Sequence, residues 1–168
     1  MLELRRYDPP KLVAVGLMAA VGLMYVLQPA GHPFTLLSVV NLIPNQLGHL
    51  IFLVFGGPVS YFGGPVVQVA FPLSLAVYLR TSYKPLYASL AVFWTAQNLF
   101  DVALYAHDAR ALTFELFGGP DHVWNTLLGR LGLLPFDHFV GVLIYSGGLV
   151  TWVAALALGL AGARKPAL

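Results

Sequence analysis

Residues 139–160 read FVGVLIYSGGLVTWVAALALGL, and no charged side chain interrupts them before Arg164 and Lys165. A helix rises 1.5 Å per residue, so roughly 20 such residues cross a hydrocarbon core about 30 Å thick. Four further apolar stretches of comparable length precede this one, at about residues 12–28, 34–55, 62–79 and 86–106. None shows the sustained alternation of a transmembrane β-strand. The sequence therefore predicts about five transmembrane helices.

The composition agrees with a chain that lives in lipid. Of its 168 residues, 58% are hydrophobic and only 10% are charged, whereas soluble domains carry about 25% charged residues. Cysteine is absent, which excludes disulfides and cysteine-based metal or nucleophile sites. The basic residues are scattered at segment ends and form no stripe for nucleic acid. We expect one all-α polytopic integral membrane bundle over residues 1–168, with the lipid bilayer as its partner.

Two connections between the apolar stretches are distinctive. Residues 56–65 read GGPVSYFGGP and carry no charge. Because Gly and Pro break helices, this stretch predicts a turn or a short re-entrant piece, with a tight surface loop favoured. Residues 107–138 form the most polar connection, and within them residues 123–134 are apolar at helical spacing. That spacing predicts a short interfacial helix.

Polar side chains recur inside the apolar stretches, where an uncompensated polar group is costly. Asn41, Asn45 and His49 are spaced four residues apart, so they share one face of a helix, and Gln46 lies beside them. In the fourth stretch Gln97 and Asp101 share a face. The supporting polar residues are Asn98, Asp108 and Gln68. Hydrogen bonding between helices accounts for single amides, but a carboxylate at depth needs a cation, a metal or a proton.

The string Asn45-Gln46-Leu47-Gly48-His49 has the shape of His-Glu-x-Gly-His. Placed inside a membrane helix, it resembles the site-2-protease class of intramembrane zinc metallopeptidases. The wider pattern between about residues 40 and 134 is similar to that of small bacterial membrane proteins related to this class. It includes Gly63-Gly64 followed by Gln68, and residues 97–101, which read QNLFD. The resemblance implies a protein of the bacterial inner membrane that handles a transmembrane peptide or helix.

In that class two histidines bind one zinc ion and the glutamate between them is the general base. Here His49 keeps the second ligand position, while Asn45 stands at the first and Gln46 at the base. An amide is a poor zinc ligand and does not accept a proton near neutral pH. Asp101 and His122 are the candidates for a third ligand. The resemblance therefore implies a metallopeptidase-like pseudoenzyme that binds zinc weakly or not at all and does not hydrolyse peptides.

The residues leave other interpretations open. The two replacements are near-isosteric, and the sequence does not separate a natural loss of catalysis from a deliberate inactivation. A small transporter or channel component could use Asp101 in an ion path, in which case Asp101→Asn abolishes flux in liposomes. A non-catalytic scaffold subunit would use every polar group for packing alone. The oligomeric state is not specified by the sequence.

Overall fold

The computed structural model describes residues 6–27, 36–114 and 122–165. In that part the chain is helical, apart from turns and a single bridge between Tyr7 and Arg164. The helices are α1 (Pro9–Leu27), α2 (Leu36–Phe52), α3 (Gly57–Thr81), α4 (Pro85–His107), α5 (Val123–Arg130) and α6 (Asp137–Ala163), with 3-10 turns η2 (Leu53–Phe55) and η3 (Leu134–Phe136). The predicted all-α helix bundle is confirmed.

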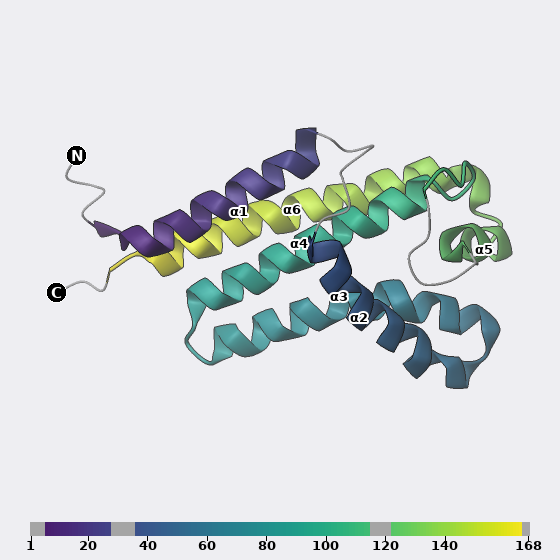
Figure 1. Ribbon diagram of the computed structural model, residues 1–168, viewed down its shortest axis with the longest axis horizontal. Helices are drawn as coiled ribbons and strands as arrows, with labels where there is room; N and C mark the ends of the chain where they lie inside the picture. The colour runs from purple at the N-terminus through teal and green to yellow at the C-terminus, as the bar shows by residue number, and fades with distance from the viewer. Residues whose placement is uncertain (1–5, 28–35, 115–121, 166–168) are drawn as a thin grey trace.

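Helix α4 is the centre of the bundle (Figure 1). It packs along α6 on one side and along α3 on another, while α1 lies on α6 and α2 lies on α3. Small residues make the α4–α6 contact close: a Cβ at Gly148 would lie 2.8 Å from the Phe100 ring, and a Cβ at Gly162 would lie 2.9 Å from the Leu86 nitrogen. Lipid removes the hydrophobic drive between helices, so close packing of this kind holds the bundle together.

Among the described residues, four stretches are long and apolar enough to cross a membrane, namely Pro9–Leu27, Leu37–Phe55, Val59–Thr81 and Leu134–Ala163. Few of their residues are buried, and large apolar side chains cover the outer surface. Such a surface is stable against lipid and not against water. The chain is therefore an integral membrane protein. Helix α4 has 23 residues and is more polar than these stretches, and several of its polar side chains are buried, namely Ser89, Thr95, Gln97, Asn98 and Asp101.

The two ends of the described chain meet at the same end of the bundle (Figure 1). The Asp8 nitrogen donates to the Ala163 carbonyl at 2.9 Å, so the start of α1 adjoins the end of α6. Helices α3, α4 and α6 run alternately between the two ends, with Gly162 beside Leu86 and Gly141 beside His107. Because the two ends of the described chain lie at the same end of the bundle, the chain must run along the length of the bundle an even number of times. Helices α1 and α2 together therefore provide one net passage.

Contacts with α4 show how α1 and α2 follow one another. The Tyr25 ring, near the end of α1, stacks on the Phe100 ring with centroids 5.5 Å apart. Asn41, near the start of α2, donates to Asp101, the next residue of α4. The end of α1 and the start of α2 therefore lie at one level of the bundle. Residues 28–35, which join them, and the predicted segment ends at 28 and 34–35 lie outside the described residues.

The predicted loop at residues 56–65 is wrong. Only Gly56 leaves the helical conformation, with φ +87°, and α3 begins at Gly57 and runs through Gly63, Gly64 and Pro65. A helix satisfies its own backbone groups, which an apolar environment requires. Gly63 and Gly64 are buried and lie against α2, so these glycines serve helix contact instead of a turn. The third Gly-Gly-Pro string, at residues 118–120, lies outside the described residues.

The polar connection contains the predicted short helix, although it is shorter than expected. Helix α5 ends at Arg130, and a turn and η3 follow before α6 begins. The Arg130 guanidinium lies 5.9 Å from the centroid of the Tyr61 ring, which ties α5 to the start of α3. Gly132 takes φ +68° in the turn, a conformation that favours glycine.

An ion pair closes the junction between α4 and α6. The Asp137 side chain is fully buried and accepts hydrogen bonds from Arg110 Nε at 2.8 Å and Arg110 Nη2 at 2.7 Å. It also accepts from the backbone nitrogens of Arg110 and His138. The hydrogen bond with Asp137 raises the pKa of the Arg110 guanidinium above its usual value.

We expect Asp137→Ala to lower the midpoint of thermal unfolding by roughly 5 °C, because charge-assisted bonds to two backbone nitrogens and a guanidinium are lost together. Differential scanning calorimetry in detergent micelles measures this shift. Lys11→Ala is the control, since its pair with Asp8 is long, at 3.5 Å, and exposed. Surface pairs of that kind contribute little, so equal shifts in the two variants would contradict the role given to Asp137.

Candidate functional site

The polar face of α2 is turned into the bundle, as its spacing predicts. Asn41 is 2% exposed and bonds to three residues of α4. Its amide nitrogen donates to Gln97 Oε1 at 2.7 Å and to Asp101 Oδ2 at 2.8 Å. Its amide oxygen accepts from the Trp94 ring nitrogen at 2.8 Å. Both amide hydrogens of Asn41 are thus used, and the side chain ties α2 to α4.

Asp101 belongs to the same network. Its carboxylate is buried, and Oδ2 also accepts a hydrogen bond from Gln97 Nε2 at 2.5 Å. Two amides therefore meet one carboxylate oxygen, an arrangement that satisfies a polar group out of water. Asp101 accordingly serves the contact between α2 and α4.

The other two residues of this polar face, Asn45 and His49, are turned towards α3. Asn45 Nδ2 donates to Gln68 Oε1 at 2.7 Å. His49 Nδ1 lies 2.9 Å from the Ser60 carbonyl oxygen. A carbonyl only accepts, so Nδ1 carries the hydrogen, and in the neutral imidazole Nε2 carries the lone pair. Metal-binding histidines are commonly oriented by such a bond from their other ring nitrogen.

Three glycines let α2 and α3 approach this closely. A Cβ at Gly48 would lie 2.0 Å from the Gly63 carbonyl oxygen, and a Cβ at Gly63 would lie 2.2 Å from the Gly48 carbonyl oxygen. A Cβ at Gly64 would lie 2.2 Å from His49 Nε2. The helix backbones therefore touch at Gly48 and Gly63, and the His49 ring lies flat against α3. Gly63 and Gly64 therefore leave room for the α2 backbone and for the His49 ring.

Gln46, at the position of the general base, faces elsewhere. Its side chain is exposed. Residues two apart on a helix lie about 160° apart around its axis, so Gln46 is nearly opposite the buried Gly48. The outer surface around it is apolar, since Ile43, Leu47 and Leu50 are also exposed. The predicted base position therefore opens towards lipid or a neighbouring protein.

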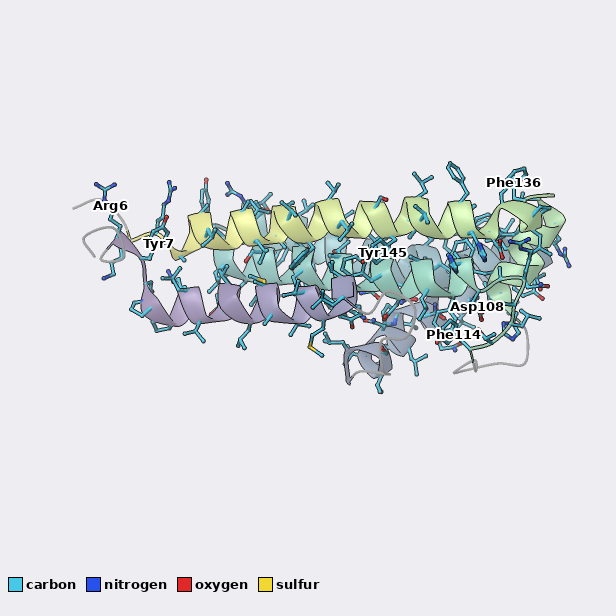
Figure 2. All side chains as sticks on the ribbon, turned by 90° about the horizontal axis from the view of Figure 1, so that it is seen from above. Arg6, Tyr7, Asp108, Phe114, Phe136 and Tyr145 are labelled. Carbon is cyan, nitrogen blue, oxygen red and sulfur yellow. The ribbon has the colours of Figure 1, made fainter. Side chains whose placement is uncertain are left out.

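The remaining predicted residues lie on elements other than α2. His122 precedes the first residue of α5. Asp108 accepts from Thr113 Oγ1 and from the Phe114 nitrogen, and so shapes the turn after α4, at the end of the bundle away from Arg6 (Figure 2). Asn98 Nδ2 donates to the Trp94 carbonyl oxygen at 2.9 Å. Its Oδ1 is buried and has no hydrogen-bond partner among the described residues.

The predicted zinc ligands His49, His122 and Asp101 are not grouped together in the described part of the chain. Within residues 6–27, 36–114 and 122–165, no three His, Asp or Glu side chains are grouped to hold a metal ion. On α2 the first ligand position holds the Asn45 amide, which is bonded to Gln68. Asp101 is bonded to Asn41 and Gln97 instead of accompanying His49. One imidazole is too small a donor set for zinc.

Two parts of the site were not identified from the sequence. Trp94 donates to Asn41, and the Ser60 carbonyl orients His49. Trp94 lies three residues before Gln97, so the sequence could have placed Trp94 on the polar side of α4. The Ser60 carbonyl carries no side-chain signal, and its role depends on α3 beginning before residue 60.

No family model matches the chain, and comparisons with curated proteins and with solved structures give no significant match.

Proposed function

We propose that this chain is a metallopeptidase-like pseudoenzyme of the bacterial inner membrane, which binds a transmembrane helix without hydrolysing it. One observation carries the proposal. His49 Nδ1 is bonded to the Ser60 carbonyl, and Asn45, one turn earlier on the same helix, is bonded to Gln68. The two ligand positions of the motif, Asn45 and His49, are thus held in place by α3, although the side chain at the first position is an amide.

The residues around His49 support the idea of a former metal site. We call positions 45 and 49, together with Gln68, the metal cradle. The Ser60 carbonyl leaves the lone pair on Nε2, as a metal ligand requires. A histidine at position 45 would stand one helical turn from His49, which is the spacing that lets two imidazoles reach one ion. Gln68 would be within reach of that histidine, because it now accepts from Asn45 at 2.7 Å.

The same residues argue against hydrolysis. The Gln46 amide cannot take a proton from water near neutral pH. Without a second imidazole and a base, no nucleophile is generated. What the site keeps is an exposed amide on an apolar helix surface, and such a group suits hydrogen bonding to another membrane helix.

The test is the metal content of the purified protein. We expect the chain itself to carry little or no zinc, and the double variant Asn45→His with Gln46→Glu to carry about one zinc ion per chain. Adding His49→Ala to the double variant should abolish binding. Elemental analysis after removal of free metal measures all three proteins.

Two further variants locate the third ligand. In the double variant, His122→Ala should reduce the zinc content, whereas the matched change His138→Ala should leave it unchanged. If the double variant binds no zinc, the cradle is absent and the proposal fails. A scaffold role, or an ion path through Asp101, would then be the better interpretation. Hydrolysis of a membrane peptide by the unchanged chain would refute the non-hydrolytic part.

A further inference from the structure

One stripe along α2 and the start of η2 has no partner among the described residues. Val39, Ile43, Gln46, Leu50 and Leu53 follow one another at spacings of four, three, four and three residues, which places them on one helix face. All five are exposed; Ile43 and Leu50 are each 66% exposed. Helix α2 packs chiefly on α3 through its opposite side, at Gly48. We call this set of five residues the outer stripe.

Gln46 makes the outer stripe unlike a lipid-facing surface. It lies midway along the apolar stretch Leu37–Phe55, nine residues from either end. Among the described residues no hydrogen bond reaches its amide. An amide that faces hydrocarbon leaves two donors and an acceptor unsatisfied, and helix association removes that cost.

We infer that a second copy of this chain covers the outer stripe, with the two Gln46 amides hydrogen-bonded to each other. A primary amide both donates and accepts, so Gln46 is complementary to itself. Two copies inserted the same way are related by a two-fold axis along the membrane normal. That symmetry places both Gln46 side chains at the same depth. A foreign helix would need a polar group of its own at that depth.

This inference deepens the proposed function. It rests on that proposal in one respect, because both take the outer face of α2 as the surface that binds another helix. The partner helix is then α2 of the second copy. Ile43 and Leu50, on either side of Gln46, form the apolar surround of the crossing. The metal cradle at His49 is not part of the contact.

Cysteine cross-linking tests the pairing, and the chain has no cysteine of its own. Leu50→Cys lies on the outer stripe, while Ile51→Cys is the matched control, being 55% exposed, at the same depth, and about 100° away around the helix. In liposomes containing only the purified chain, we expect Leu50→Cys to form a covalent dimer at least about fivefold faster than Ile51→Cys with a short bismaleimide. Adding Gln46→Leu should weaken association about tenfold in a lipid-dilution series, since paired amides are worth about that factor in membranes.

Gln46→Leu is expected to leave the monomer folded, because Gln46 is exposed and makes no hydrogen bond among the described residues. Equal cross-linking at positions 50 and 51, or unchanged association in Gln46→Leu, would overturn the inference. So would a cross-link in native membranes to a different protein in place of the dimer. The proposed function is judged separately by zinc uptake, so a failed cross-link with zinc bound to the double variant refutes the dimer alone.

Discussion

Asn41→Leu is expected to destabilise the folded protein by about 3 kcal/mol. The substitution removes three hydrogen bonds at once, to Trp94, Gln97 and Asp101. At the average of about 0.6 kcal/mol measured for bonds between membrane helices, three bonds account for about 2 kcal/mol. Two of the deserted partners are fully or almost fully buried, and one is a carboxyl group, so the cost of leaving them unsatisfied raises the total. Reversible unfolding by SDS in mixed micelles measures the free energy.

Asn45→Leu is the matched control for this variant. It lies one turn along the same helix and loses only the bond to Gln68. We expect a cost of about 1 kcal/mol for it. If Asn41→Leu costs no more than Asn45→Leu, the network around Asp101 does not hold α2 to α4.

Gly63→Val is expected to separate α2 from α3 and to cost about 4 kcal/mol. Even the first carbon of the new side chain would lie 2.2 Å from the Gly48 carbonyl oxygen. That oxygen belongs to a helix backbone and has no rotamer to change, so the two helices must move apart. Overpacking alone costs about 1–3 kcal/mol. The movement also breaks the bonds of Asn45 and His49 to α3, each worth about 1 kcal/mol.

Gly147→Ala tests whether this cost is specific to the contact. Gly147 lies on α6, and a Cβ there would meet nothing within 4 Å. We expect a neutral effect or a gain of up to about 1 kcal/mol from helix propensity. Both variants are compared by SDS unfolding, and zinc uptake by the double variant in the Gly63→Val background should be lost as well. A Gly63→Val protein as stable as Gly147→Ala would refute the close contact.

The candidate site was predicted in part. The four-residue spacing placed Asn41, Asn45 and His49 on one face, and the structure turns that face into the bundle. The spacing could not say that Asn41 meets α4 while the other two meet α3, because that division depends on how α2 crosses both helices. It also could not place Asp101 with Asn41 instead of His49, since residues 60 positions apart meet only through tertiary packing.

The sequence by itself determined that the chain is an α-helical membrane protein, because apolar length and scarce charge leave no other stable state. Tertiary structure alone decided the rest. It made Gly63-Gly64 a helix contact instead of a loop, because local preference for a turn is weaker than the need to satisfy backbone groups in an apolar environment. It also placed the two ends of the described chain together, so that α1 and α2 share one passage. Hydropathy shows which residues avoid water. It does not show at which level of the bundle a helix begins, because that level depends on contacts between helices.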